Sequence, residues 1–304
     1  MSGRIVSIVD GYGYDKMIDD LNKLCQANPF LRLSYIGESV MGKPIPAIQV
    51  GNGKVKVHYN AAFHANEWMT SLLMMVFLEE YTSAIGTDGY MLDQRATELF
   101  NQISLFIVPM VNPDGVDLVH FGAGASHPYY ESLFQWNQGS TDYSQWKSNI
   151  HGVDLNDQYP AHWEQEKLRR SPEGPGPRDY PGTAPLTEPE AVALAAFTQH
   201  HNFGLVMAFH TQGREIYWNY RDYEPEQAYG IAKQLAKVSG YEAIKLTDSD
   251  AGYKDWFIQE YRRPGFTIEA GYGCNPLPMD QFTEIYEEVR PIFIHGLSLS
   301  LVSD

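Results

Sequence analysis

Three apolar runs of this sequence are each followed by a residue that can bind a metal ion or transfer a proton. Residues 55–59 alternate in β-branched and aromatic types, and His64 and Glu67 come shortly after them. The second run ends in His210, and the third ends in Glu269 with glycines behind it. Imidazole and carboxylate groups that meet at one point can bind zinc, provided that a third ligand and an open position exist. The pattern therefore predicts a zinc site; the alternative is that these are polar residues that cap strands or face solvent.

The elements that must position these residues are strands and helices that alternate along the chain. Hydrophobic periodicity and turn residues set their expected limits. Strands are expected at residues 31–36, 46–50, 55–59, 103–110, 205–210 and 266–269. Helices are expected at residues 14–27, 70–80, 92–101, 191–200, 226–239, 254–261 and from 280 onward. Candidate ligands at the ends of several strands are typical of an α/β fold whose active site lies at the strand ends.

Two local signals make sharper predictions. Asn52-Gly53 is a common turn sequence and predicts a hairpin that leads into the strand before His64. Thr187 stands three residues before Glu190, which is the spacing of a capping box and predicts the start of the next helix.

Length and composition favour one domain, residues 1–304, in which residues 1–10 could be a linker or an added start. The chain has no Ser/Gly-rich linker, repeat or break in composition. The long segment 121–178 is rich in aromatic residues, Gly and Pro, so we expect an ordered loop region that lines a pocket. No apolar run approaches the ~18 residues that span a bilayer, and the N-terminus lacks the features of a signal peptide. The two cysteines, Cys25 and Cys274, argue against a disulfide framework.

The charge balance excludes one class of partner. Asp and Glu number 38 and Lys and Arg 22, which gives a formal net charge of −16. Nucleic-acid binding depends on neutralising phosphates with Lys and Arg, so nucleic acid is not expected as a partner. The charge is compatible with an amine-bearing substrate, but it serves mainly solubility.

Several motifs resemble those of the zinc carboxypeptidases, the family that contains pancreatic carboxypeptidase A and its bacterial relatives. They occur in the family's order and at compatible spacing, over most of the chain. The matching segments are His64-Ala65-Asn66-Glu67-Trp68, Gly152-Val153-Asp154-Leu155-Asn156, residues 181–190, His210 and Thr267-Ile268-Glu269. The resemblance implies a single-domain α/β fold with a mixed β-sheet flanked by helices.

The resemblance also implies roles for individual residues. One zinc ion is expected, bound by His64, Glu67 and His210, with water in the fourth position. Glu269 is the expected general base, which takes a proton from the water and passes it to the leaving amine. Asp154 is expected to orient His64, because a carboxylate fixes the tautomer of a ligating imidazole.

The substrate pocket is where the sequence departs from the family. Lys147 takes the place of the arginine that polarises the scissile carbonyl, and we expect it to stabilise the oxyanion together with zinc. Relatives that cut a free C-terminus hold its carboxylate with an arginine directly after the Asn of Gly-Val-Asp-x-Asn, where this chain has Asp157. A second arginine of the family is replaced by Asn66. Asn66, Asn156 and Asp157 are therefore expected to bind a substrate that carries a cation, unless Asp157 binds a structural partner.

An aspartate at that position resembles the bacterial branch of the family that cleaves the γ-D-glutamyl bond to meso-diaminopimelate. The expected protein is a zinc metallopeptidase of cell wall degradation, a hydrolase whose substrate is a peptidoglycan-derived peptide. Its expected place is the cytoplasm or the cell envelope of a bacterium, with no membrane span. Two alternatives stay open: a metallocarboxypeptidase of other specificity, and a zinc deacylase of acylated amino acids on the same scaffold.

Overall fold

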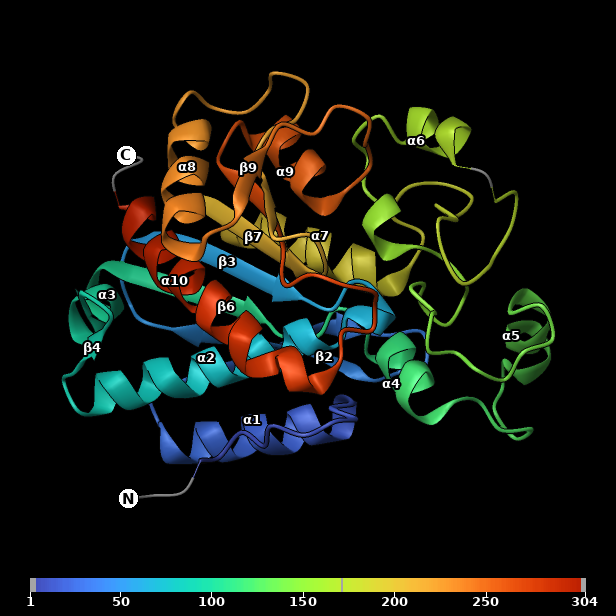
Figure 1. The fold of residues 1–304 in the computed structure, drawn as a ribbon, viewed down its shortest axis with the longest axis horizontal. Helices are drawn as coiled ribbons and strands as arrows, with labels where there is room; N and C mark the ends of the chain where they lie inside the picture. The colour runs from blue at the N-terminus through green and yellow to red at the C-terminus, as the bar shows by residue number, and fades with distance from the viewer. Residues whose placement is uncertain (1–3, 171, 302–304) are drawn as a thin grey trace.

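The computed structural model describes residues 4–170 and 172–301. An eight-stranded sheet runs through the centre with helices around it, which confirms the predicted α/β fold (Figure 1). The strands lie in the order β1, β2, β6, β3, β7, β10, β8, β9. Their bounds are β1 Arg32–Glu38, β2 Pro44–Val50, β3 Val55–Ala61, β6 Ile103–Val108, β7 Leu205–His210, β8 Glu215–Tyr217, β9 Glu242–Ile244 and β10 Gly265–Glu269. A separate small hairpin consists of β4 Tyr90–Met91 and β5 Gln94–Arg95.

The sheet is mixed, with four parallel strands at its centre. β6, β3, β7 and β10 pair in parallel, whereas β2 and β8 pair antiparallel to them on either side. Every residue of β6 and of β7 is buried, as expected for strands that are covered on both faces. Because parallel strands end at one edge of a sheet, the residues that follow β3, β7 and β10 meet at the same place.

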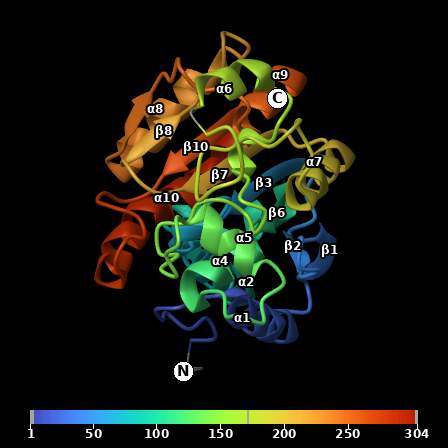
Figure 2. The ribbon, with the colours of Figure 1, turned by 90° about the vertical axis from the view of Figure 1, so that its right-hand side faces the viewer.

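Helices cover both faces of this sheet. Figure 2, viewed from one end of the strands, shows α7 and α9 on one side and α2 and α10 on the other. The helices of the first side are α7 Pro189–His201 and α9 Tyr253–Tyr261; those of the second are α1 Tyr14–Ala27, α2 Met69–Gly86, α8 Gln227–Ser239 and α10 Phe282–Ser300. Each side has its own apolar cluster, with Leu194 and Phe257 in one and Leu72 and Phe293 in the other. The sheet is therefore held rigidly between two packed layers.

The remaining helices are short. They are α3 Ala96–Gln102, α4 Pro113–Phe121, α5 Tyr130–Trp136 and α6 Trp163–Arg169, with the 3₁₀ turns η1 Ala65–Glu67, η2 Leu155–Asp157 and η3 Met279–Gln281. In Figure 1, α4, α5 and α6 gather at the end toward which the β3 arrow points. The described residues of the aromatic segment 121–178 are ordered there, as predicted; residue 171 lies outside the described residues.

The hairpin predicted at Asn52-Gly53 is wrong. β6 lies between β2 and β3, antiparallel to the first and parallel to the second. Gly51 has a φ of +93°, and a Cβ atom there would lie 2.1 Å from the Ile103 carbonyl oxygen. The chain therefore turns tightly against the start of β6, since this fully buried strand takes the place between the other two.

The capping box predicted at Thr187 is also wrong. α7 begins at Pro189 with Glu188 as its N-cap residue. The Thr187 amide and hydroxyl instead donate to Gln158 Oε1, at 2.8 and 3.1 Å. Proline at the first helical position needs no partner for an N–H group, so α7 can begin without a side-chain cap.

The ends of the chain and the short elements also differ from expectation. The described part of the predicted N-terminal linker packs on the helices: Val6 is buried and donates its amide to Glu79 Oε2 at 3.1 Å. Residues 1–3 lie outside the described residues. The helix expected from residue 92 begins at Ala96, because residues 94–95 pair in the small hairpin. Within residues 4–170 and 172–301, no helix combines the length and the apolar character that a membrane crossing requires.

Candidate metal centre and active site

The turn after β3 carries two of the predicted ligands. β3 ends at Ala61, Ala62 has a φ of +54°, and His64 is the N-cap residue of η1. The Thr70 hydroxyl accepts from the Ala62 amide at 3.0 Å and donates to the Glu67 carbonyl oxygen at 2.7 Å. The first turn of α2 is thus bound to the strand end, and the offset of three residues turns His64 and Glu67 to one side.

The structure brings His64, Glu67 and His210 together at the carboxyl edge of the parallel strands. Their potential ligand atoms all lie within 4.8 Å of one another, and all three residues are buried. His64 Nδ1 lies 2.8 Å from Glu67 Oε1 and 3.2 Å from His210 Nδ1, which is itself 3.0 Å from Glu67 Oε2. The two ring nitrogens are close together and both are directed at one carboxylate. Their protons or lone pairs would repel each other unless a cation lay between them. The donor set therefore fits zinc.

Neighbouring groups orient these ligands. Asp154 Oδ1 lies 3.1 Å from His64 Nε2, so that Nε2–H can donate to it while Nδ1 faces the metal position. The Thr211 amide donates to Glu67 Oε2 at 3.1 Å. The Asn275 side chain donates to the Thr211 carbonyl oxygen at 2.7 Å and reaches Glu67 Oε1 at 3.5 Å. Both His64 and Glu67 are thus held by groups from distant segments.

Glu269 ends β10 directly beside the metal ligands. The parallel pairing of β10 with β7 aligns Glu269 with His210, and the antiparallel pairing with β8 aligns it with Glu215. Burial raises the pKa of Glu269 to about 8; Glu67 adds to the rise, while the positive charges of His64 and Lys147 oppose it. A carboxylate with a pKa near neutral can accept and return a proton at neutral pH, which suits a general base.

Lys147 faces the same site from the loop between α5 and η2. Its amide donates to the Pro177 carbonyl oxygen at 2.7 Å, and its own carbonyl oxygen accepts from the Ala65 amide at 2.9 Å. Burial alone would lower the pKa of Lys147, but the carboxylates around it, chiefly Asp154 and Glu67, outweigh burial and raise the pKa. Lys147 therefore stays positively charged within the field of the site.

Asn66 and Asn156 lie next to the metal ligands. The Asn156 amide donates to Asp154 Oδ1 at 3.0 Å, and its side-chain oxygen accepts from the Tyr253 amide at 3.4 Å. Asn66 is buried within η1, and its side-chain oxygen has no hydrogen-bond partner among the described residues. The substrate contacts predicted for both remain predictions.

Asp157 forms an ion pair within the chain. Arg170 Nη2 donates to Asp157 Oδ1 at 2.9 Å, and Arg170 Nε lies 2.8 Å from Asp157 Oδ2. Arg170 Nε also lies 2.8 Å from Glu166 Oε1. Burial and the nearby Asp154 raise the pKa of Asp157, and Arg170 opposes this rise. The Asp157 side chain is only 3% exposed, whereas that of Arg170 is 32% exposed. The predicted ammonium ligand is thus covered by a guanidinium group of the chain, the kind of structural partner that the alternative interpretation required.

Sequence reasoning missed two residues of this neighbourhood, Arg170 and Asn275. Arg170 stands 13 positions after Asp157, directly after the short helix α6 inside the aromatic segment, and no periodic pattern joins the two. Asn275 stands 208 positions after Glu67. Neither contact follows from local spacing, so no signal within the sequence motifs could have revealed them.

Comparisons with known proteins agree with this geometry. The model of the zinc carboxypeptidase family matches residues 17–291. The chain is 50% identical over 299 residues to gamma-D-glutamyl-L-diamino acid endopeptidase 1 of Lysinibacillus sphaericus, a match that covers 98% of this chain and 75% of that protein. It is 40% identical over 296 residues to the uncharacterized protein YqgT of Bacillus subtilis (strain 168), with 92% and 78% covered.

Solved structures extend the likeness to the fold. Bovine thrombin-activatable fibrinolysis inhibitor, in complex with tick carboxypeptidase inhibitor, superimposes with a TM-score of 0.74 at 18% identity, covering 96% of this chain and 98% of that one. The family match spans the His64–Glu67 turn, His210 and Glu269, so it includes every element that builds the site. This chain belongs to the zinc carboxypeptidase family.

Proposed function

We propose that this protein hydrolyses the amide bond between a γ-D-glutamyl residue and meso-diaminopimelate in peptides derived from peptidoglycan. The observation that carries the proposal is the 50% identity, over 98% of the chain, to an enzyme named for cleavage between γ-D-glutamyl and an L-diamino acid. The replacement of the family's carboxylate-binding arginine by Asp157 supports a specificity other than that for an ordinary C-terminus.

We propose that each chain binds one zinc ion through His64, Glu67 and His210. The three buried ligand groups converge, and Asp154 and Thr211 fix two of them. Bound there, zinc would supply a Lewis acid that polarises the amide carbonyl and lowers the pKa of water.

The other residues of the site have complementary roles in this proposal. Glu269 accepts the proton of the attacking water and returns it to the leaving amine. The Lys147 ammonium group, held within the site by its backbone contacts, stabilises the negative charge that develops on the carbonyl oxygen. Asn66 and Asn156, beside the ligands, contact the substrate around the scissile bond.

In the pair of Asp157 and Arg170, the guanidinium group is the charge that meets the distal end of the substrate. That end of meso-diaminopimelate carries both an ammonium and a carboxylate group. Arg170, the more exposed member, is placed to meet the carboxylate through its planar fork. Asp157 holds Arg170 in place, since its two oxygens lie 2.9 and 2.8 Å from the guanidinium group.

A cleavage assay with matched substrates tests the proposal. L-Ala-γ-D-Glu-meso-diaminopimelate is compared with its lysine analogue and with a hippuryl substrate for ordinary carboxypeptidases. We expect a clear preference for the diaminopimelate peptide and one equivalent of zinc by elemental analysis. Preference for the hippuryl substrate would identify an ordinary metallocarboxypeptidase, and activity confined to small acylated amino acids would identify a deacylase.

A further inference from the structure

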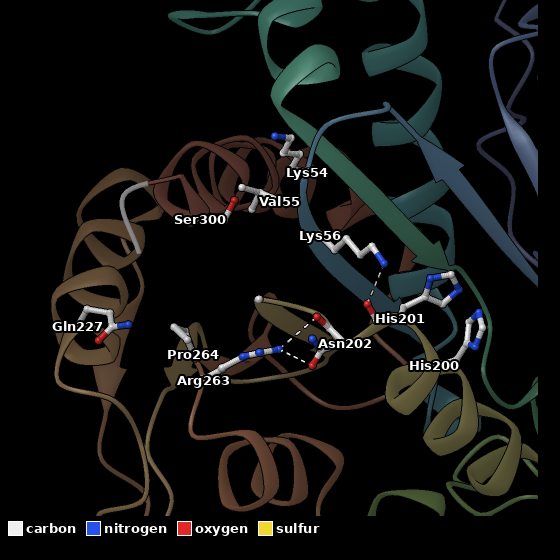
Figure 3. A pocket seen from close by; sticks show the side chains of 11 residues that line it. Lys54, Val55, Lys56, His200, His201, Asn202, Gln227, Arg263, Pro264 and Ser300 are labelled. Carbon is white, nitrogen blue, oxygen red and sulfur yellow. Dashed lines mark hydrogen bonds between the residues drawn. The ribbon is translucent and has the colours of Figure 1, made fainter. Parts of the chain in front are cut away.

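A pocket of about 420 Å³ opens at the edge of the sheet opposite the metal site. Its walls come from the start of β3, the residues just before β7 and β10, the end of α7 and the last residue of α10 (Figure 3). β3 has seven residues, so at ~3.3 Å per residue the pocket lies roughly 20 Å from the turn that carries His64. The pocket is therefore separate from the catalytic site.

The charge of this pocket is opposite to that of the molecule. Lys54, Lys56 and Arg263 line it together with the imidazoles of His200 and His201, and among the described residues that line it none is Asp or Glu. Acidic residues outnumber basic ones by 38 to 22 in the sequence. Even so, the three cations form no ion pair with any residue in 4–170 or 172–301. A locally positive concavity on a strongly negative chain favours an anion.

The side chains within the pocket keep donors to spare. Lys56 Nζ donates to the His201 carbonyl oxygen at 3.1 Å, and Arg263 Nη1 donates to the carbonyl oxygens of Asn202 and Phe203 at 3.1 and 2.7 Å. Figure 3 shows Lys56 and Arg263 directed toward the end of α7. The first bond satisfies the last carbonyl of α7, and the other two satisfy the carbonyls of the two residues that follow the helix.

That capping role accounts for only part of the donors. Arg263 Nε and Nη2 have no hydrogen-bond partner among the described residues, and Lys54 makes no hydrogen bond with any of them. Burial lowers the pKa of His201 to about 4, with His200 and Lys56 as further causes and no carboxylate opposing them. His201 is therefore neutral at pH 7 and can offer one ring N–H group.

We propose that this pocket binds a phosphate group. Guanidinium and ammonium groups are the common protein ligands of phosphate, and the free edge of Arg263 matches two of its oxygens. Three cations without a counter-charge suit a phosphate better than a single carboxylate. The pocket volume falls within the ~300–1,000 Å³ that is usual for ligand sites. The phosphate could belong to a free phosphate or to a phosphodiester polymer, and the chemistry of recognition is the same.

Calorimetric titration of the zinc-loaded enzyme with inorganic phosphate at low ionic strength tests the proposal, because salt would screen the interaction. We expect saturable binding that weakens by at least ~10-fold in a Lys56→Gln/Arg263→Gln variant. Lys23→Gln/Lys237→Gln, which removes two charges from exposed helix surfaces, should bind like the wild type. If the double variant is unstable, Lys54→Gln replaces it, because Lys54 makes no hydrogen bond with any described residue. Lys54→Gln should also weaken phosphate binding.

The outcomes separate this site from the catalytic one. Phosphate binding that persists in both pocket variants but disappears when zinc is removed would place the anion on the metal and overturn the proposal. If phosphate binding weakens equally in the pocket variants and the control variant, it is a general effect of net charge, and the proposal is wrong. Peptidase activity should be the same in all variants. A glycerol-phosphate oligomer serves as the second ligand: tighter binding per phosphate than inorganic phosphate identifies a polymer, and equal binding identifies a free anion.

Discussion

The buried carboxylates of the site differ in the groups that surround them, and this difference separates their roles. Burial acts against ionisation of Glu67 and Asp154, but the contacts with neighbouring groups, His64 first among them, outweigh burial and lower the pKa of both. Glu269 has no side-chain hydrogen-bond partner among the described residues, and burial raises its pKa. In the proposed mechanism, the groups that stay anionic to bind or orient are thus distinguished from the group that exchanges a proton.

Glu269→Gln should keep the zinc ion but lower kcat by at least ~10²-fold, the usual scale for loss of a general acid–base group. Glutamine preserves the size of the side chain and removes only its ability to carry a proton. Elemental analysis and steady-state kinetics on the same preparation measure both effects. Near-normal turnover in this variant would show that the proton is transferred elsewhere.

Lys147→Met should lower kcat more than it raises KM. The ammonium group is expected to act on charge that is present only in the transition state, and the loss of such an interaction appears in kcat. Methionine retains most of the aliphatic side chain. If KM rises while kcat is unchanged, Lys147 is an anchor for the bound substrate instead.

Arg170→Gln should reduce activity on the diaminopimelate peptide by at least ~10-fold, because truncating one partner of a desolvated charge pair typically costs about 2–5 kcal/mol. The loss should be much smaller on the lysine analogue, which lacks the distal carboxylate. Asp157→Asn should likewise lower activity on the diaminopimelate peptide more than on the lysine analogue, because it loosens Arg170. Arg169→Gln is the matched control, because Arg169 is the neighbouring cation of α6 and contacts Glu166 and Asp250. Equal losses on both substrates in Arg170→Gln would contradict a carboxylate contact.

At the level of elements, polar contacts attach the first turn of α7 to two neighbouring loops. The first turn of α7 brings the buried Glu190 to the loop after β1, where its Oε1 accepts from the Val40 amide at 3.1 Å. Its Oε2 accepts from Asn149 at 3.3 Å, in the segment that leads to η2. Burial is the main cause that raises the pKa of Glu190, from 4.5 to about 7. α7 is therefore attached to the fold by a group whose charge changes near neutral pH.

This raised pKa has a defined consequence for stability. A carboxyl group with a higher pKa in the folded state binds more protons there than in the unfolded state, so stability falls as pH rises from about 4.5 through about 7. Glu190→Gln should remove this dependence, leaving stability at pH 5 nearly unchanged and raising it at pH 8, by up to roughly 3 kcal/mol. Denaturant unfolding at both pH values measures the effect. Glu242→Gln, on an exposed position of β9, should change neither, and an unchanged pH dependence in Glu190→Gln would assign it to other groups.

At the scale of the whole molecule, the metal site joins parts of the chain that are far apart in sequence. Glu67 follows β3 and His210 ends β7, and 143 positions separate them. Between the two lie the helices from α2 to α7, the strand β6 and the whole aromatic segment. A metal ion held by both ligands therefore stabilises the packed sheet as well as the site.

Removal of zinc should lower the melting temperature. A ligand at 1,000-fold its Kd stabilises the folded state by about 4 kcal/mol, and about 2–4 °C per kcal/mol for large domains gives a fall of roughly 8–16 °C. Differential scanning calorimetry with and without a chelator measures this change. His64→Ala should melt like the chelated wild type and should not respond to the chelator. Full zinc occupancy in that variant would remove His64 from the ligand set.

The sequence by itself determined the fold class, the family and the residues that meet at the metal site. These depend on local properties: the apolar periodicity that specifies strands and helices, and ligand types placed directly after strand ends. Parallel strands then bring His64, His210 and Glu269 to one edge without further information. The family motifs are likewise short segments, which can be identified without knowing their surroundings.

Only the tertiary structure decided which side chains face one another across distant segments. It placed β6 between β2 and β3, where a local turn signal predicted a hairpin. It paired Asp157 with Arg170, and so gave the proposed substrate pocket a cation that the motif alone lacks. It also gathered Lys54, Lys56 and Arg263 in one pocket, away from the acidic majority of charges. Such contacts depend on how the layers pack, and packing is a property of the whole chain that local spacing does not encode.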